Sequence, residues 1–443
     1  MHRSILLQNA TLLTLAPQTV DRGDLRLRDG VIVERGPSLP PAEGEEVVDL
    51  TGCCVMPGLV CAHTHLYSAL SRGMPGPSSA PVDFVDILEK VWWRLDRALD
   101  EPSVRMSATV GAIDALRAGT TTLIDHHASP RFIEGSLEAV RDSLAEVGLR
   151  GVLCYEVTDR GGLAERDAGI AAHAALLAQG SDGRFSALVG AHASFTLSAE
   201  TLTQCVKTAS EAGVGVHIHV AEAASDVADA RARFGFGVVE RLRRAGALGP
   251  RTLIAHATHL TDDELTVVRD SGAWLLHNPR SNMNNQVGYA RTGSFGDRVA
   301  LGTDGIGADM FEELRAAFFK ARDAHAPWLA EACVAALANG QRLASDLLGV
   351  RLGSLDPGAA ADLVVLDYDS PTPLHAGNLA WHLVFGISSL HVRDVLIDGA
   401  WRLRDRAVLG LDVDSTMHRA RIVTEDVWAR MTALPHTPMW PRP

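Results

Sequence analysis

Histidines whose spacing suits metal binding recur along this chain, beginning with His63 and His65 in the segment CAHTH. Residues two apart in an extended strand point to the same side, so both imidazoles can face one ion. A second pair, His217 and His219, is followed three residues later by Glu222. Taken alone, each pair fits a buried core histidine better than a metal ligand.

Three further segments carry polar residues of the same kind, namely His256 in LIAHA, His277 in LLHN and Asp304 in LGTDG. Each follows a short apolar run that is typical of a buried strand. In a barrel of parallel strands, the active site is assembled at the C-terminal ends of the strands. Because all these residues stand at such ends, their joint placement favours one active site over a set of unrelated core histidines.

The elements that must position these residues follow a βα rhythm. Short apolar runs alternate with amphipathic stretches such as 198–213 and 261–272, which have the polar start and glycine stop of capped helices. The predicted strands are 55–63, 120–127, 150–157, 185–192, 213–220, 252–257, 273–278 and 299–305. The sequence therefore predicts an α/β fold, a (β/α)8 barrel of the TIM type.

Two β-rich segments flank this region and are expected to form a small composite β-sandwich domain from residues 1–55 and 356–411. Each contains an Asp-Gly hairpin signal, at Asp29-Gly30 and Asp398-Gly399. The catalytic barrel then spans 56–355, and 412–443 form a C-terminal helical tail packing on the barrel.

One βα connection, residues 71–103, is longer than its neighbours and contains Trp92 and Trp93. Long insertions of this kind lie over the mouth of a barrel, so the segment is a candidate lid. A helix that merely buries two tryptophans fits equally well.

Composition narrows the class of partner. The net charge of -13 argues against nucleic acid, because phosphate binding needs a concentrated positive surface. No apolar run is long enough for a membrane span, and the first residues lack a secretory signal. The six cysteines lack CxxC spacing and stand in apolar stretches, as expected for reduced thiols in a cytoplasmic enzyme. We therefore expect a small-molecule partner.

These segments resemble the amidohydrolase superfamily, in its branch of cytosine, guanine and S-adenosylhomocysteine deaminases and triazine chlorohydrolases. The resemblance covers nearly the whole chain and rests on VMPGLVCAHTH, AGTTTLID, the HxxE of His219 and Glu222, AHATHL, HNPRSN, LGTDG and GSLDPGAAADLVVLD. Within that branch, HTHLYSALSRGM, TLIDHHASP, CYEVTDR, SNMNNQVG and TDGIGADM look most like the aminohydrolases called SsnA.

The resemblance implies one set of metal ligands: His63, His65, His219 and Asp304. It also implies that Glu222 shuttles protons and that His256 polarises the group under attack, while Asp304 helps a proton reach the departing amine. Many two-metal members bridge their ions with a carbamylated lysine after strand four, but residues 185–198 contain no lysine. We therefore expect one divalent ion, zinc rather than iron, although this ligand set accepts both.

An ion with an open coordination position makes hydroxide available near neutral pH. The expected reaction is its addition to a C-NH2 carbon of a purine-, pterin- or pyrimidine-like heterocycle, with release of ammonia. Opening of a cyclic amide, or loss of chloride or an alkylamine from a triazine, uses the same site and is the alternative. A non-catalytic binding barrel is disfavoured, because neither a ligand nor Glu222 is missing. A structural metal module is disfavoured because the ligands are spread along the chain.

The residues expected to contact the substrate are His192, His127, Trp93, His277 and Asn282. His192 is matched by position to a substrate-contacting histidine of the family, although Ala193 and Ser194 depart from the family motif. Other residues of the predicted rim fit loop-capping roles better than substrate contacts: His126, Glu156, Asp159, Arg280 and Asn285. A homodimer is the expected assembly.

Overall fold

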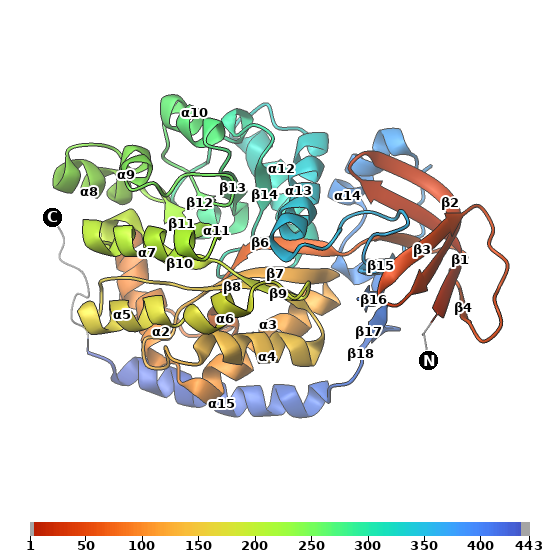
Figure 1. Cartoon of the computed structure of the whole chain (residues 1–443), viewed down its shortest axis with the longest axis horizontal. Coiled ribbons are helices and arrows are strands. Elements are labelled where there is room, and N and C mark those ends of the chain that lie inside the picture. Colours follow the sequence, from red (N-terminus) through yellow and green to blue (C-terminus); the bar gives the residue numbers. More distant parts are fainter. Residues whose placement is uncertain (1–3, 436–443) are drawn as a thin grey trace.

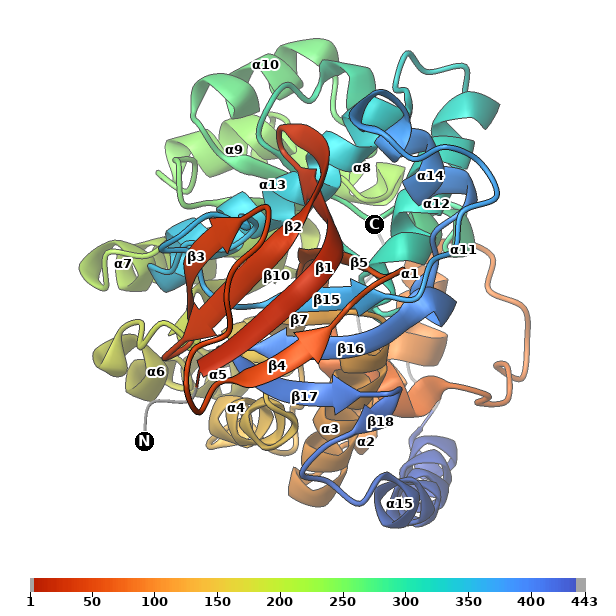
Figure 2. The same cartoon turned by 90° about the vertical axis from the view of Figure 1, so that its right-hand side faces the viewer.

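A nine-stranded sheet joins the two ends of the chain in the computed structural model, which describes residues 4–435. Its strands run in the order β18-β17-β16-β15-β5-β1-β2-β3, with β4 paired to β1. The antiparallel pairing of β5 with β15 sets Pro57 opposite Leu363, and Figure 2 shows the sheet face on. The strands are β1 (Ser4–Leu15), β2 (Gln18–Arg28), β3 (Val31–Gly36), β4 (Glu46–Asp49), β5 (Cys54–Pro57), β15 (Leu363–Leu366), β16 (Val392–Ile397), β17 (Ala400–Arg404) and β18 (Ala407–Val408).

Both hairpins expected from Asp-Gly pairs are present in this sheet. Asp29 and Gly30 join β2 to β3, and Asp398 and Gly399 join β16 to β17, all four with positive φ. Two positive φ values in a two-residue loop match the right-handed twist of the strands that it connects. The two turns lie against each other, since a Cβ on Gly30 would come within 2.5 Å of Asp398 Oδ1.

Two parallel sheets hold the central part of the chain, in the orders β6-β7-β8-β9 and β10-β11-β12-β13-β14. Isolated parallel bridges connect the two sheets, from Thr64 to Asp304 and from Val157 to Ala191. The strands are β6 (Leu59–Thr64), β7 (Thr120–His127), β8 (Arg150–Tyr155), β9 (Phe185–Ala187), β10 (Val189–Ala193), β11 (Val216–Val220), β12 (Leu253–His256), β13 (Trp274–His277) and β14 (Val299–Leu301).

Each of the eight predicted runs contains a strand, but two runs are interrupted. The run 55–63 breaks at Gly58, whose amide donates to the Asp362 carbonyl at 2.8 Å, so its first half joins the nine-stranded sheet and its second half begins the parallel one. The run 185–192 breaks at Leu188. Because of these breaks, each of the two runs contributes strands to two different sheets.

Helices cover the parallel strands on the outside (Figure 1). Ser198 caps α7 and Thr261 caps α10, in a capping box with Glu264, so both predicted helix starts are confirmed. The covering helices are α3 (Glu101–Arg117), α4 (Ser136–Val147), α5 (Leu163–Ala171), α6 (Ala174–Gln179), α7 (Ala199–Glu211), α8 (Ala224–Phe234), α9 (Val238–Arg244), α10 (Asp262–Asp270), α11 (Pro279–Asn284), α12 (Met310–Asp323) and α13 (Ala330–Leu348).

The predicted insertion 71–103 contains α1 (Phe84–Ile87), the π-helical turn η2 (Leu88–Trp92) and α2 (Trp93–Ala98). The C-terminal helix α15 (Val413–Ala433) lies beside α2 and α3, where Trp428 Nε1 donates to the Leu70 carbonyl at 3.1 Å. Residues 1–3 and 436–443 of the predicted terminal segments lie outside the described residues. The remaining short elements are η1 (Leu66–Ser71), η3 (Ser194–Thr196), η4 (Thr292–Ser294), η5 (Ala376–Asn378), α14 (Leu379–Phe385) and η6 (Ser389–His391).

All six cysteines are buried free thiols, as predicted. Among the described helices, none combines the length and apolarity that a bilayer crossing needs.

Candidate functional site

A small cavity of about 40 Å³ lies at the C-terminal ends of the parallel strands. We call it the histidine cavity. Carboxylates and imidazoles reach it from strand ends, whereas aromatic and apolar side chains reach it from the insertion. Its lining is His65, Tyr67, Phe84, Leu88, Trp92, Trp93, Glu156, His192, His219, Glu222, Asn285, Asp304 and Gly305. The insertion therefore contributes both Trp92 and Trp93 to the cavity wall, and Trp93 is nearly fully buried; its role as a lid stays a prediction.

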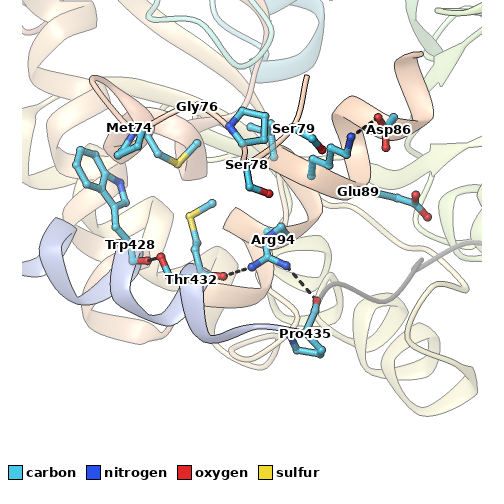
Figure 3. Close-up of a pocket in the computed structure, with 15 residues that line it drawn as sticks. Met74, Gly76, Ser78, Ser79, Asp86, Glu89, Arg94, Trp428, Thr432 and Pro435 are labelled. Carbon is cyan, nitrogen blue, oxygen red and sulfur yellow. Dashed lines mark hydrogen bonds and ion pairs between the residues drawn. The ribbon is translucent and has the colours of Figure 1, made fainter. Parts of the chain in front are cut away.

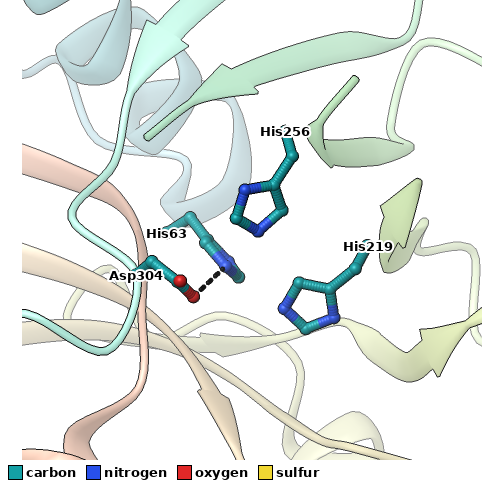
Figure 4. Close-up of side chains that lie close together, drawn as sticks. All are labelled: His63, His219, His256 and Asp304. Carbon is teal, nitrogen blue, oxygen red and sulfur yellow. Dashed lines mark ion pairs between the residues drawn. The ribbon is translucent and has the colours of Figure 1, made fainter. Parts of the chain in front are cut away.

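The four predicted metal ligands converge beside this cavity. Asp304 Oδ1 lies 2.8 Å from His65 Nε2 and 3.2 Å from His63 Nε2, and the Nε2 atoms of His65 and His219 are 3.2 Å apart. Figure 4 shows His63, His219 and Asp304 pointing toward a common centre, with His256 beside them.

Zinc bonds of 2.0–2.1 Å in a tetrahedral site set neighbouring ligand atoms ~3.3 Å apart, close to the three separations found here. The rings are also fixed from behind, since His65 Nδ1 donates to the His126 carbonyl at 2.6 Å and His219 Nδ1 to the His192 carbonyl at 2.8 Å. Such bonds orient metal-binding imidazoles. His63 Nε2 has no hydrogen-bond partner within residues 4–435. The donor set therefore fits a divalent ion.

The site contains two overlapping groups of potential metal ligands. Within each group, all ligand atoms lie within 4.8 Å of one another. One contains His63, His219, His256 and Asp304, and the other contains His65, His126, Glu156 and His219. The Nδ1 atoms of His65 and His219 are engaged by backbone carbonyls, so each ring has only Nε2 for an ion. If both Nε2 atoms bind one ion together with Asp304, the second group keeps only His126 and Glu156 as ligands for a second ion.

Electrostatics differ sharply between the two histidines beside Asp304. Burial lowers the pKa of His63 to about 3, which keeps its ring neutral as a metal ligand must be. Burial also opposes the charged form of His65, but the hydrogen bond and charge of Asp304 outweigh it and raise the pKa of His65 to about 9. An ion that binds here displaces the proton shared by this pair.

Glu222 and His256 form a second polar pair at the cavity. Glu222 Oε2 lies 3.5 Å from His256 Nε2, and Asn285 donates to Glu222 Oε1 at 3.2 Å. Burial raises the pKa of Glu222 to about 7, with the charge of Asp304 adding to the rise and His256 opposing it. A carboxyl with a pKa near neutrality can both accept and deliver a proton.

The backbone at the strand ends is strained. His256 and Asp304 have φ values of 73° and 54°, and Ala221 and Ala257 are also in the left-handed region. Such conformations cost on the order of 1–3 kcal/mol each for non-glycine residues and cluster at functional sites. These residues lie at or just after the ends of β11, β12 and β14, close to the metal-capable side chains of the site.

The predicted substrate residues divide into two groups. Trp93 and His192 line the histidine cavity. His127, His277 and Asn282 are buried but do not line it. His127 Nε2 lies 2.8 Å from Ser129 Oγ, and Asn282 Oδ1 accepts a hydrogen bond from His256 Nδ1 at 2.8 Å.

His277 lies among the rings of Tyr289, Phe295 and Trp328. Burial lowers its pKa to about 3. The structure therefore gives His277 the surroundings of a neutral core residue, and its substrate contact stays a prediction.

Two polar residues of the site had no sequence signal strong enough to single them out. Tyr67 lines the cavity two residues after His65, and Ser281 donates a hydrogen bond to Asp304 Oδ2. The spacing of Tyr67 from the HTH segment is the one hint that the sequence offers, because Ser281 reaches Asp304 only through the fold.

A larger cavity of about 690 Å³ lies between the insertion and α15 (Figure 3). Arg94 crosses its floor and donates to the carbonyl oxygens of Leu434 and Pro435 at 3.1 and 3.0 Å. No histidine of the described chain lines it. This cavity is larger than the histidine cavity, but the potential metal ligands and the carboxylates of Glu222 and Asp304 converge at the histidine cavity.

Known proteins match this chain along most of its length. A 5-methylthioadenosine/S-adenosylhomocysteine deaminase of Halobacterium salinarum is 32% identical over 428 residues, covering 93% of this chain and 95% of that protein. A 5'-deoxyadenosine deaminase of Methanosarcina mazei is 30% identical, covering 97% and 99%.

Solved structures share the fold. An adenosine deaminase of Xanthomonas campestris with bound zinc superposes with a TM-score of 0.85 at 24% identity, covering 98% of this chain and 99% of that one. The zinc complex of an atrazine chlorohydrolase of Arthrobacter aurescens gives 0.81 at 20% identity, covering 95% and 100%. The family model described as amidohydrolase family matches residues 54–402. This chain therefore belongs to the amidohydrolase family.

Proposed function

We propose that this protein is a metal-dependent aminohydrolase that removes an amino group from a purine-like or related heterocycle. The observation that carries the proposal is the convergence of His63, His65, His219 and Asp304 beside a cavity that also holds Glu222. Two relatives that match nearly the whole chain are named as deaminases of adenosine-type compounds, which supports the same reaction here. The reaction class is hydrolysis of a carbon-nitrogen bond outside peptides.

We further propose one divalent ion, zinc rather than iron, on these four ligands. The engaged Nδ1 atoms of His65 and His219 support a single ion, because a second would retain only His126 and Glu156. Two structural neighbours were solved with zinc bound, which agrees with this preference. When bound, such an ion supplies a water of lowered pKa and an electrostatic pull on the attacked group.

The chain's own residues divide the remaining tasks. Glu222 accepts a proton from the attacking water and delivers it to a ring nitrogen, which suits its raised pKa. His256, held through Nδ1 by Asn282, presents Nε2 where charge develops on the attacked group. Asp304, held through Oδ2 by Ser281, helps a proton reach the departing amine. Trp92, Trp93 and Phe84 line the cavity, where apolar rings exclude water and can pack against a planar heterocycle.

For the fold, we propose that β6 to β14 close into a (β/α)8 barrel with the N- and C-terminal strands as a separate sandwich domain. The parallel bridges Thr64 to Asp304 and Val157 to Ala191 support closure. The pairing of β5 with β15 supports the division into 1–55 with 356–411, 56–355 and 412–443. The homodimer stays a prediction.

The test is ammonia release from a panel of aminated purines, pterins and pyrimidines by the zinc-loaded protein. Ammonia from any member, lost after chelation and restored by zinc, supports the proposal. Chloride from a chlorotriazine, or a new carboxylate from a cyclic amide, without ammonia from the panel, would favour the alternative hydrolase.

A further inference from the structure

Glu156 is a buried carboxylate of the histidine cavity that has no role in the proposed reaction. Glu156 follows β8, where its amide donates to the His127 carbonyl at 2.7 Å, and only 4% of the residue is exposed. Its side chain lines the same cavity as Glu222 and Asp304. A charged group in such a place needs either a structural or a ligand-binding reason.

The neighbours of Glu156 are close enough to hold its charge but too distant to use up its oxygens. Oε2 lies 3.3 Å from His126 Nδ1, and Oε1 lies 3.8 Å from His192 Nε2 and 3.9 Å from an Arg160 nitrogen. Charge-assisted hydrogen bonds are shorter, about 2.7–2.9 Å. His126 Nδ1 has no hydrogen-bond partner among residues 4–435. The carboxylate can therefore still accept from a ligand.

Glu156 and Asp96 share one buried arginine. Arg160 is buried and pairs with Asp96 at 2.6 Å, and its guanidinium stacks 4.6 Å over the Trp93 ring. One cation thus serves both Asp96 and Glu156. Burial alone would raise the pKa of Glu156, but His192, His126 and Arg160 hold it well below its usual value. The cavity therefore offers a fixed anionic acceptor.

The distance of Glu156 from the proposed metal ligands indicates which part of a bound substrate it would contact. Its ligand atom lies within 4.8 Å of those of His65 and His219, two of the proposed metal ligands. The carboxylate thus stands beside the reacting carbon. A group beside the reacting carbon contacts the heterocyclic base itself, so this carboxylate is placed to meet the base.

Glu156 and Glu222 lie beside two different ring neighbours of His219. The His219 ring stacks on His256, the neighbour of Glu222, at 5.5 Å, and meets the ring of His126, the neighbour of Glu156, edge-on at 4.7 Å. If Glu222 serves the ring nitrogen on one flank of the reacting carbon, Glu156 faces the other flank.

Heterocyclic amines differ at that second flank. In adenine and cytosine the amino-bearing carbon has a ring nitrogen on one side and a ring carbon on the other. In guanine, pterin and isocytosine it lies between a ring nitrogen and a ring N–H. An ionised carboxylate only accepts hydrogen bonds, so it favours a flank that donates.

We propose that Glu156 accepts the N–H that flanks the reacting carbon, and that the substrate is a cyclic acylguanidine such as a guanine, pterin or isocytosine. Water adds to the carbon between the two nitrogens, the bond to the exocyclic amine breaks, and ammonia leaves while the ring carbon becomes a carbonyl. This inference rests on the proposed deaminase function and adds the substrate class. It makes Glu156 a specificity-determining residue.

The test compares wild type and one Glu156 variant on two pairs of substrates, each pair differing by one N-methyl group. Zinc-loaded wild type and Glu156→Gln are assayed for ammonia with guanine against 1-methylguanine and isocytosine against 3-methylisocytosine, with adenine, cytosine and 5'-deoxyadenosine alongside. The wild type is expected to use the unmethylated acylguanidines and to lose about 100-fold in kcat/KM on methylation, as a hydrogen bond to a charged group allows. In Glu156→Gln this ratio is expected to fall to about 10 or less, because the charge is gone.

Glu165→Gln is the matched control, since it removes a carboxylate from the Arg97 ion pair outside the cavity. A binding measurement separates recognition from turnover: in a Glu222→Gln background, calorimetry is expected to show guanine binding more tightly than 1-methylguanine.

The outcomes separate the two proposals. Preference for adenine, cytosine or 5'-deoxyadenosine, or an equal loss on methylated and unmethylated substrates in Glu156→Gln, would overturn the role of Glu156 while leaving a deaminase. Ammonia from no compound of the panel would overturn the proposed function itself.

Discussion

Ser281 donates a hydrogen bond to Oδ2 of Asp304, which leaves Oδ1 of that carboxylate facing His63 and His65. Ser281 belongs to α11, the short helix after β13, so this contact ties the end of β14 to the neighbouring strand. A carboxylate held in this way presents one oxygen in a fixed direction. The hydroxyl therefore supports the proposed metal site by orienting Asp304.

Removing this support should weaken metal binding without abolishing it. Ser281→Ala is expected to raise the zinc Kd about 10–100-fold, the usual effect of losing a partner behind a ligand. Competition with a chromophoric chelator measures the change. Ser210→Ala, an exposed serine of α7, is the control and should leave the Kd unaltered. A wild-type Kd for Ser281→Ala would show that the hydroxyl does not orient Asp304.

Two buried histidines at strand ends should respond differently to the same substitution. His63→Ala removes a proposed ligand, so elemental analysis should find less than one zinc per chain. His277→Ala opens space among Tyr289, Phe295 and Trp328, so it should lower the melting temperature but keep the metal. Full zinc content in His63→Ala would contradict the ligand assignment.

Glu222→Gln should keep the metal and lose turnover. The amide cannot accept the water proton, and general-base catalysis contributes typically about 10²–10⁴-fold. Glu264→Gln is the matched control, because Glu264 completes the capping box of α10 away from the cavity. Steady-state ammonia release with parallel zinc analysis decides the matter, and wild-type turnover in Glu222→Gln would remove this residue from the mechanism.

Strand-end placement predicted which residues come together, but not which way each one faces. Glu222 and Asp304 line the cavity as expected, whereas His277, the last residue of β13, turns toward aromatic side chains. Side chains alternate between the two faces of a strand. β13 spans only Trp274–His277, which is too short for the sequence pattern to show which face His277 occupies. The Ser281 to Asp304 contact and the β5 to β15 pairing join residues far apart in the chain. Local periodicity carries no signal for such contacts.

A buried ion pair links the parallel strands to the nine-stranded sheet. Arg150 of β8 donates to both carboxylate oxygens of Asp362 at 2.7 and 2.8 Å, and both side chains are almost fully buried. Asp362→Ala leaves the guanidinium with the Gly183 carbonyl and, as its remaining carboxylate, the more exposed Asp398. Breaking a buried pair costs about 3–5 kcal/mol, so we expect a markedly lower melting temperature.

The exposed pair Lys207–Glu211 supplies the control for this prediction. Glu211→Gln should alter stability by about 0.5 kcal/mol or less, as surface changes usually do. Equal melting temperatures for Asp362→Ala and Glu211→Gln would show that the Arg150 contact does not hold the two sheets together.

Asp125 of β7 should make the stability of the wild type depend on pH. Its Oδ1 accepts from the Leu66 amide at 2.7 Å, and Oδ2 has no hydrogen-bond partner in the described part of the chain. Burial raises the pKa of Asp125 to about 7 despite the bond from Leu66. In the unfolded chain the carboxyl returns to a pKa of about 3.9. Between these two values the folded state holds a proton that the unfolded state has released, so the wild type loses stability as pH rises through this window.

Asp125→Asn removes this titration and keeps an acceptor for Leu66. The stability of the variant relative to wild type is therefore expected to improve from pH 5 to pH 7 and to level off above it. Melting temperatures of the two proteins at matched pH values test this, because the other titrating groups are common to both and largely cancel in the difference. A difference that stays flat, or that moves in favour of the wild type as pH rises, would show that Asp125 is already ionised in the folded protein.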